Sequence, residues 1–171
     1  MSNFQHPTPA GSLTIASVDT GVKVSAQYNP KELQIDKSVP WQKNPQANKS
    51  PDKGIQLEFT GAEGRSMSVE LLFDGYETGV PVIPQVEALN SMASPMEPGS
   101  TDENKRRPPL CVVVWGATIS KFTCVIESLS TKYTMFSPEG VPLRATCTVK
   151  LKEANVLSMA KSDASGSGSQ K

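Results

Sequence analysis

Few side chains in this sequence of 171 residues are placed to do chemistry. The segment Asp74-Gly-Tyr-Glu77 brings two carboxylates close together, and most glycoside hydrolases act through such a pair. Asp-Gly is also a common turn at the end of a strand. The one histidine, His6, lies in a proline-containing leader, so neither a Ser-His-Asp nor a Cys-His site has a credible base. We therefore expect no catalysis, with a hydrolase at Asp74 and Glu77 as the enzymatic alternative.

The cysteines give little support to a metal or cofactor site. Cys111, Cys124 and Cys147 are an odd number at wide spacing, and each lies in an apolar or alternating stretch. Such residues are typical of reduced core positions in a protein that stays in the cytoplasm. The sequence also lacks the glycine-rich loops that hold phosphate groups. We expect no metal and no cofactor.

The charges are balanced, with 17 basic and 17 acidic residues. This balance argues against binding nucleic acid or anionic lipid through bulk charge. Lys105-Arg106-Arg107 is the densest basic run, and the acidic residues just before it favour a solvated loop over a nucleic-acid patch. The sequence has neither an apolar run of about 20 residues, as a membrane helix needs, nor a signal-peptide pattern at its start. We expect synthesis in the cytoplasm, no membrane insertion and no specific nucleic acid.

The stretch 66–75 is the clearest structural element. Its apolar residues alternate with polar ones, which predicts a half-buried strand ended by Asp74-Gly75. Phe73 lies on the apolar face together with Met67, Val69 and Leu71. Leu72 falls on the polar face, so it is either a lone surface leucine or a residue covered by a helix or another subunit.

Comparable patterns predict further strands at 13–18, 22–28, 33–39, 55–60, 110–115, 119–129 and 143–151. We expect 55–60 to form a hairpin with 66–73, and the continuous apolar run 110–115 to be buried on both faces. Residues 82–94 recur at three and four positions, which predicts one amphipathic helix. Polar loops are expected at 42–53 and 97–107.

Together these elements predict a mainly β fold, a β-sandwich or barrel with one attached α-helix. The single domain should cover residues 13–157. A leader over 1–12 and a Gly/Ser tail over 158–171 should be flexible, because both are short of large apolar groups.

Eight short blocks carry a resemblance to a known family. In order they are Gln27-Tyr-Asn-Pro-Lys-Glu-Leu33, Lys37-Ser-Val-Pro-Trp41, Leu57-Glu-Phe-Thr-Gly61, Ser68-Val-Glu-Leu-Leu-Phe-Asp-Gly75, Arg107-Pro-Pro-Leu110, Val114-Trp-Gly116, Tyr133-Thr-Met-Phe136 and Gly140-Val-Pro-Leu-Arg-Ala145. They resemble the tube-type proteins of bacterial contractile injection systems, which are phage-tail-like particles. The similarity spans about residues 13–155, and the Gly/Ser ending resembles the short form that lacks a LysM module.

The resemblance implies a tail-tube fold of two packed antiparallel sheets with a flanking helix. It further implies a hexameric ring at the baseplate end of the inner tube, where the tube joins the spike hub. The partners would be further copies of the chain, the neighbouring inner-tube protein, the spike or hub protein, and other baseplate or sheath proteins. The competing interpretation is a small β-barrel that binds nucleic acid or carbohydrate.

In this interpretation named residues have structural roles. Anchors in the core or at a subunit boundary, with the core favoured for the tryptophans, are Trp41, Leu72, Phe73, Trp115, Tyr133 and Phe136. The glycines that permit turns are Gly75, Gly116 and Gly140. Candidates for ion pairs between subunits are Glu70, Asp74, Arg107 and Arg144, with solvated arginines as the alternative. The residues expected to face the lumen are Ser68, Thr146 and Thr148.

Overall fold

The computed structural model describes residues 11–44, 54–61 and 63–154. Residues 1–10 of the predicted leader, 45–53 of the first predicted loop and the whole predicted tail lie outside the described residues. The described part is mainly β with a single α-helix, which confirms the predicted fold class.

The strands are β1 (Thr14–Ser17), β2 (Lys23–Ser25), β3 (Leu33–Asp36), β4 (Trp41–Lys43), β5 (Leu57–Phe59), β6 (Ser66–Asp74), β7 (Cys111–Trp115), β8 (Ile119–Phe136) and β9 (Pro142–Glu153). The helices are α1 (Ile83–Met92) and the short 3-10 helix η2 (Glu103–Lys105). α1 confirms the predicted amphipathic helix, and its proline is tolerated in the first turn.

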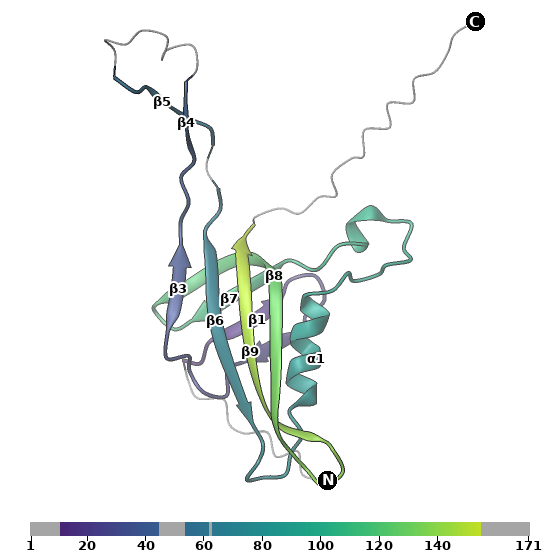
Figure 1. Cartoon of the computed structure of the whole chain (residues 1–171). Coiled ribbons are helices and arrows are strands. Elements are labelled where there is room, and N and C mark those ends of the chain that lie inside the picture. Colours follow the sequence, from purple (N-terminus) through teal and green to yellow (C-terminus); the bar gives the residue numbers. More distant parts are fainter. Residues whose placement is uncertain (1–10, 45–53, 62, 155–171) are drawn as a thin grey trace, which may run out of the picture.

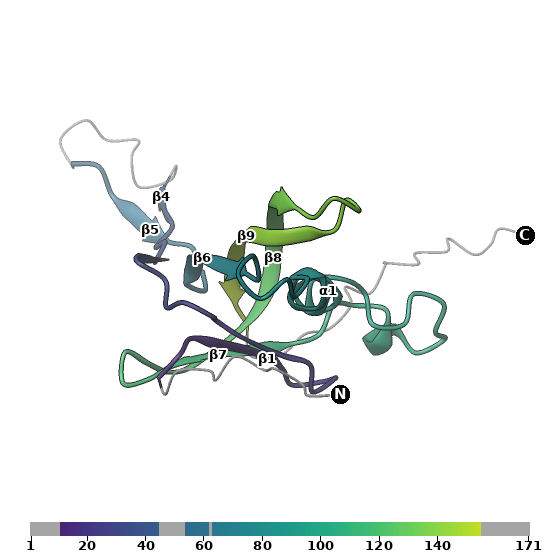
Figure 2. The ribbon, with the colours of Figure 1, turned by 90° about the horizontal axis from the view of Figure 1, so that it is seen from below.

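One seven-stranded antiparallel sheet, in the order β2-β1-β7-β8-β9-β6-β3, makes up the body. The sheet curls so that β1 and β7 form a layer opposite β6, β9 and the far half of β8 (Figure 2). The two expected layers therefore belong to one hydrogen-bonded sheet. β8 joins them: its 18 residues pair first with β7 and then with β9, and a register shift between Ile126 and Ser128 marks the bulge.

The core lies between the two layers, with α1 beside β8 (Figure 1). α1 contributes Val86, Leu89 and Met92 to this core, and β6 contributes the four apolar residues of its predicted buried face. Phe73 is 1% exposed. The pattern that predicted a half-buried strand at 66–73 is confirmed along its whole length.

Two details of the predicted strands are wrong. β6 does not form a hairpin with 55–60, because it pairs with β9 along its full length and with β3 at its start, whereas β5 pairs with β4. The run 110–115 is not buried on both faces. Cys111 and Val113 face the core, but Val114 is 41% exposed because the described residues pack against only one face of β7.

β4 and β5 form a second, two-stranded sheet that projects beyond the body from the ends of β3 and β6 (Figure 1). We call residues 37–44 and 54–61 the arm. Strand β4 includes Gln42 and Lys43, which were predicted to belong to the loop 42–53.

Two of the predicted turn glycines have a left-handed backbone. Gly116 has φ +50° and Gly140 has φ +82°. Gly140 lies in the turn between β8 and β9, where its N–H donates to the carbonyl of Ser137 over 2.9 Å. Gly75 is required for a different reason, its close approach to Val80.

Replacing Gly140 by valine is expected to lower the free energy of unfolding by about 1 kcal/mol or more, because a β-branched residue resists a positive φ. A built Cβ meets nothing within 4 Å there, so the cost comes from the backbone rather than from a clash. Urea unfolding of the variant and of Gly99→Val measures it, since Gly99 also has open space but no positive φ. Equal losses at both positions would contradict the turn assignment.

Candidate functional site

The outer face of the layer formed by β6, β9 and the far half of β8 is polar. Cross-strand register places Ser68 beside Lys150, Glu70 beside Thr148, and Leu72 beside Thr146. The three residues predicted to face a lumen, Ser68, Thr146 and Thr148, therefore share this face, which alternates with the buried face of the same strands. Leu72 is 37% exposed on it. A molecule bound to this face would contact small hydroxyl groups and scattered charged side chains.

An ion pair between Asp74 and Arg144 lies at the end of this face where β6 ends. Asp74 and Arg144 are register partners, and Oδ2 of the aspartate accepts from Nη2 (2.6 Å) and Nε (3.0 Å) of the arginine. The hydrogen bond from Arg144 holds the pKa of Asp74 below its usual range. The pKa of Arg144 is raised, chiefly by the same bond and to a smaller extent by the nearby Tyr28 and Tyr76.

The same geometry bears on the hydrolase alternative. Oδ1 of Asp74 accepts from the backbone N–H of Tyr76 over 2.9 Å, so both carboxylate oxygens are engaged. A carboxylate held in its charged form is a poor general acid. Glu77 is exposed in the turn that follows. Asp74 serves the turn and the ion pair, and this geometry gives the two-carboxylate chemistry no support.

The basic run 105–107 is neutralised by acidic partners within the chain. Nζ of Lys105 lies 3.6 Å from Glu97, and Nη2 of Arg106 lies 3.6 Å from Glu103. The more buried Arg107 pairs with Asp19 over 3.1 Å and ties the loop to the turn between β1 and β2. Burial opposes ionisation of Asp19, but hydrogen bonds from the backbone of Leu110 and from Arg107 outweigh it and lower its pKa. The run offers little free positive charge to nucleic acid.

Both arginines predicted to bridge subunits therefore have partners inside the chain. Arg144 pairs with Asp74 and Arg107 with Asp19. Glu70 is exposed on the outer face. Bridges between copies stay a prediction for these residues, and any such bridge has to compete with the internal pairs.

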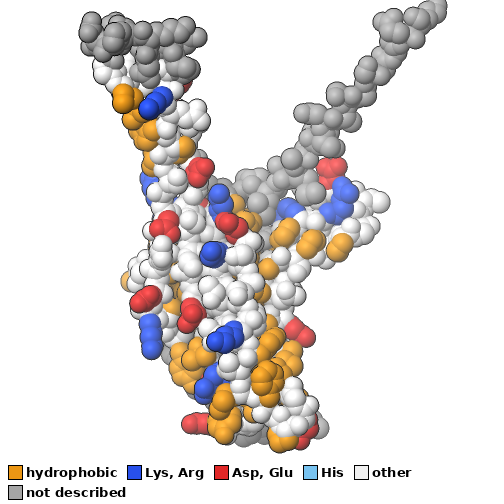
Figure 3. All heavy atoms as spheres, viewed as in Figure 1, with side chains coloured by type: hydrophobic (Ala, Val, Ile, Leu, Met, Phe, Trp, Pro, Cys, Tyr) orange, Lys and Arg blue, Asp and Glu red, His pale blue; other side chains and the backbone are white. Residues whose placement is uncertain are grey.

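The arm carries apolar side chains that are exposed among the described residues. Trp41 packs its ring against Phe59 with centroids 5.5 Å apart and planes tilted by 56°. Trp41 is nevertheless 56% exposed, so its favoured placement in the core is wrong. Val39, Ile55 and Leu57 are exposed as well. The arm is too small to bury these groups by itself, and the apolar side chains are visible along it in Figure 3.

The other predicted anchors divide between the core and the surface. Phe73 is in the core, and Trp115 is half-buried against it. Tyr133 and Phe136 are exposed at the end of β8, away from the arm. Met135, between them, has φ +55°. Sequence patterns did not reveal this residue, because a left-handed conformation is uncommon for methionine.

The three cysteines are buried and free, as predicted. Burial raises the pKa of Cys111 to about 11 and that of Cys124 to about 12, so these thiols are poor nucleophiles at neutral pH. Across the described ranges no cluster of three or more metal-binding side chains occurs. No helix in the same ranges is long and apolar enough to span a bilayer.

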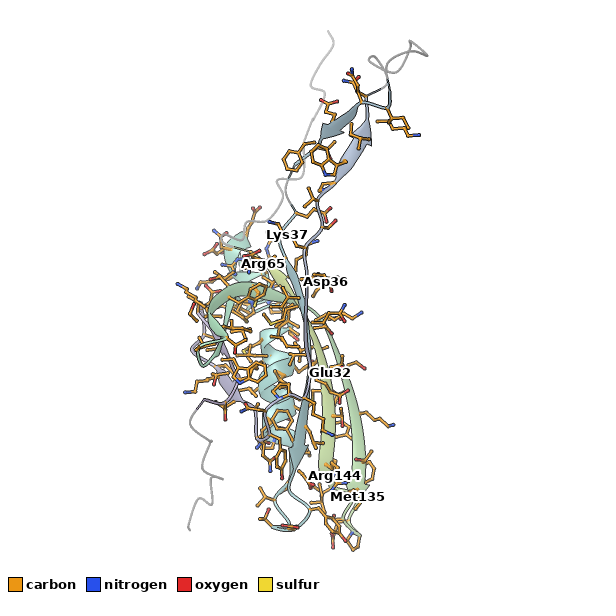
Figure 4. All side chains as sticks on the ribbon, turned by 90° about the vertical axis from the view of Figure 1, so that its left-hand side faces the viewer. Glu32, Asp36, Lys37, Arg65, Met135 and Arg144 are labelled. Atoms are coloured by element: carbon orange, nitrogen blue, oxygen red, sulfur yellow. The ribbon has the colours of Figure 1, made fainter. Side chains whose placement is uncertain are left out.

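An ion pair that the sequence did not reveal joins the two strand ends nearest the arm. Arg65 donates from Nη2 (2.8 Å) and Nε (3.1 Å) to the carboxylate of Glu153, and its guanidinium lies 5.2 Å from the ring centroid of Phe122. The hydrogen bonds from Arg65 lower the pKa of Glu153 to about 2. Figure 4 shows Arg65 at this end of the body, close to Lys37.

Stability should fall as acid protonates Glu153. Because its pKa is lowered in the folded chain, its contribution is present above the ordinary value of 4.5 and is lost as pH falls towards about 2. Between pH 4.5 and about 2, the free energy of unfolding of Glu153→Gln should fall by about 1 kcal/mol less than that of the parent. The difference is small because solvent screens an ion pair at the surface. Urea unfolding between these pH values measures the difference, with Glu77→Gln as the exposed-carboxylate control. Parallel pH profiles for Glu153→Gln and the parent would contradict the assignment.

A family model with the description contractile injection system tube protein matches residues 14–161, which include nearly all of the described body and arm. No curated protein matches the chain.

Proposed function

Because the chain belongs to the contractile injection system tube protein family, we propose that it forms a non-enzymatic hexameric ring at the baseplate end of the inner tube. There the ring joins the tube to the spike hub of the particle. It is a structural component, and its partners are further copies of itself, the neighbouring tube protein and the hub. The ring is assembled in the bacterial cytoplasm.

The observation that carries this proposal is that the layer formed by β3, β6, β9 and the far half of β8 has two open edges. β3 is one edge of the sheet, and β8 beyond Cys124 pairs only with β9 among the described strands. Open edges are liable to aggregate unless another strand covers them. If β3 of one copy meets the far half of β8 in the next, the contact is heterologous, and a closing rotation makes a ring.

The chemistry of the outer face supports the same arrangement. A ring closed through these edges would turn one face of the layer towards the axis and the core towards the outside. The outer face carries the predicted lumen residues Ser68, Thr146 and Thr148, whose small hydroxyl side chains suit a surface along which cargo slides. Leu72 would be the one apolar contact among them.

Ring formation is tested by light scattering and electron microscopy of the purified chain with the tube and hub proteins present. We expect hexamers with contacts on the order of 2,000 Å² or more, as in obligate assemblies. A chain that stays monomeric and unbound under these conditions would overturn the proposal. Salt-dependent binding to single-stranded nucleic acid would instead favour the small binding barrel.

A single proline substitution in β3 tests whether this edge strand makes the contact between copies. Backbone groups alternate sides along β6: the N–H of Gly75 donates to Leu143 of β9, whereas the N–H of Asp74 donates to the side chain of Gln27 on the opposite side. With Ser68 in register with Gln34, this alternation turns the N–H of Ile35 outwards.

Ile35→Pro should therefore abolish ring closure and leave the fold nearly intact, because an outward N–H at an edge has no partner within the sheet. Gln34→Pro is the matched control, since it removes an inward bond to β6 and should destabilise the monomer. Rings of normal size from a folded Ile35→Pro variant would exclude β3 as the contact.

A further inference from the structure

The outer face of the layer formed by β1 and β7 carries apolar side chains, on strands whose other face lies against the core. Register places Ala16 of β1 beside Val112 of β7, and both alternate along their strands with buried neighbours, as does Val114. Val18 continues the ladder beyond β1, because its N–H donates to the carbonyl of Leu110 over 2.8 Å. We call Ala16, Val18, Val112 and Val114 the valine face. It differs in chemistry from the polar outer face of β6 and β9.

The described residues leave the valine face largely uncovered. Val18 is 60% exposed and Val114 is 41% exposed, whereas Val113 on the core side of β7 is fully buried. Figure 2 shows β6, β9, the far half of β8 and α1 on the same side of β1 and β7. An apolar surface on a sheet gains free energy when it is removed from water. The apolar run that predicted a strand buried on both faces therefore presents a second face suited to a cover.

The chain enters this layer through a turn at Gly11. The φ of Gly11 is +85°, a left-handed conformation that glycine adopts without strain. A Cβ built there meets nothing within 4 Å, so the turn itself, and not a close contact, calls for glycine. Residues 1–10, which lie outside the described part, are joined to β1 through this turn. A left-handed turn at this point directs the preceding segment back along the strand that follows.

The composition of residues 1–10 suits an apolar sheet face. They include no acidic side chain, no lysine and no arginine, and their apolar members are Met1, Phe4, Pro7, Pro9 and Ala10. Proline has no N–H, so a segment with two prolines has fewer backbone donors to satisfy when it lies on a sheet face without a partner strand. The segment after Ala154 carries three charged side chains and fits the face less well.

The lengths of the two segments match. Phe4 stands seven positions before Gly11, and Val18 stands seven positions after it. An extended chain covers about 3.3 Å per residue in either direction. A segment that doubles back at Gly11 therefore brings its one aromatic side chain to Val18, the most exposed member of the valine face.

We propose that residues 1–10 fold back at Gly11 and cover the valine face, with Phe4 packed against Val18. This contact goes beyond the proposed ring, because it is made within one copy and shields a surface on the side away from the predicted lumen residues. It gives the predicted leader a fixed place, in contrast to the flexibility that its composition suggests.

Cross-linking within the full chain tests where the leader lies. Phe4→Cys is combined with Val18→Cys, and mild oxidation should join the two positions by a disulfide, identified by mass spectrometry, while the three native thiols stay buried. The matched control combines Phe4→Cys with Leu72→Cys, since Leu72 is an exposed apolar residue on the opposite layer, and should give at least tenfold less product. Equal yields from the two pairs, or links between copies in place of the internal product, would overturn the proposal.

Deletion of the leader tests whether it covers apolar surface. Removing residues 1–10 should leave the fold intact, because the buried core starts at Leu13. The deletion should raise the fluorescence of the dye ANS by about twofold or more, since ANS binds exposed apolar surface. Val18→Ser with Val114→Ser in the shortened chain should return the fluorescence to the level of the full chain.

Removing residues 158–171 is the matched control deletion and should leave the fluorescence unchanged. A rise on that deletion alone would assign the face to the C-terminal segment. No rise on either deletion would leave the face to a second copy or to another protein. Each of these two results would overturn the inference. Both experiments use the free chain, so a failure of the proposed ring to assemble would not change them.

Discussion

Replacing Phe73 by alanine is expected to lower the free energy of unfolding by about 3–5 kcal/mol. Phe73 is 1% exposed and is the largest of the fully buried side chains in the described residues. It lies on β6, opposite Ala145 of β9, whose small side chain leaves space for the ring. Removing the aromatic side chain would leave a cavity in the core next to β6, the strand that joins β3 to the rest of the sheet.

The adjacent Leu72 is a matched control for Phe73. Both residues lie on β6 next to each other, but Leu72 points to the outer face and is 37% exposed. Leu72→Ala should cost well under half as much, because a partly exposed side chain loses less burial and leaves no closed cavity. Urea unfolding of both variants, followed by far-UV circular dichroism, gives the comparison. Similar losses at the two positions would mean that both faces of β6 are buried in the free chain.

The sequence predicted which face of a strand is buried better than it predicted which strands pair with each other. Alternation over 66–73 identified the buried side of β6 correctly, because side-chain direction depends only on the period of the strand. The partner of a strand depends on the whole topology. β6 pairs with β9, which comes much later in the chain, so the expected hairpin with 55–60 was wrong. A short turn between two patterned stretches does not prove that they pair.

The arm shows why a correctly identified alternating pattern can lead to a wrong prediction of which side chains are buried. Ile55, Leu57 and Phe59 alternate with polar residues, as in a half-buried strand, yet each is at least 50% exposed. Alternation indicates that one face is suited to a partner, but it does not say that the partner belongs to the same chain. Trp41 was expected in the core or at a subunit boundary, with the core favoured, because large aromatic side chains are usually buried. In a subunit of an assembly, such mismatches mark the surfaces where contacts between copies are expected.

The ion pairs within the chain that sequence reasoning missed depend on the register of the strands. Arg65 and Glu153 belong to distant parts of the chain, and they meet because β6 and β9 lie side by side. Asp74 and Arg144 were chosen as charged partners between subunits, but register makes them direct neighbours within one chain. Once the pairing of β6 with β9 is known, both contacts follow from counting residues along the two strands.

The turn that ends β6 has almost no free space. The N–H of Gly75 donates to the carbonyl of Leu143 over 2.8 Å, and the carbonyl of Gly75 accepts from the N–H of Val80 over 3.2 Å. A Cβ built on Gly75 would lie 1.8 Å from the carbonyl oxygen of Val80. That oxygen belongs to the backbone, so it cannot move without moving the whole turn from Gly75 to Val80.

Gly75→Ala is therefore expected to lower the free energy of unfolding by about 1–3 kcal/mol, as overpacking does elsewhere, and to shift the turn that leads into α1. Gly54→Ala is the control, since a Cβ there meets nothing within 4 Å. Urea unfolding of the two variants and the parent measures the loss. A Gly75→Ala variant as stable as the parent would show that the turn can shift at little cost.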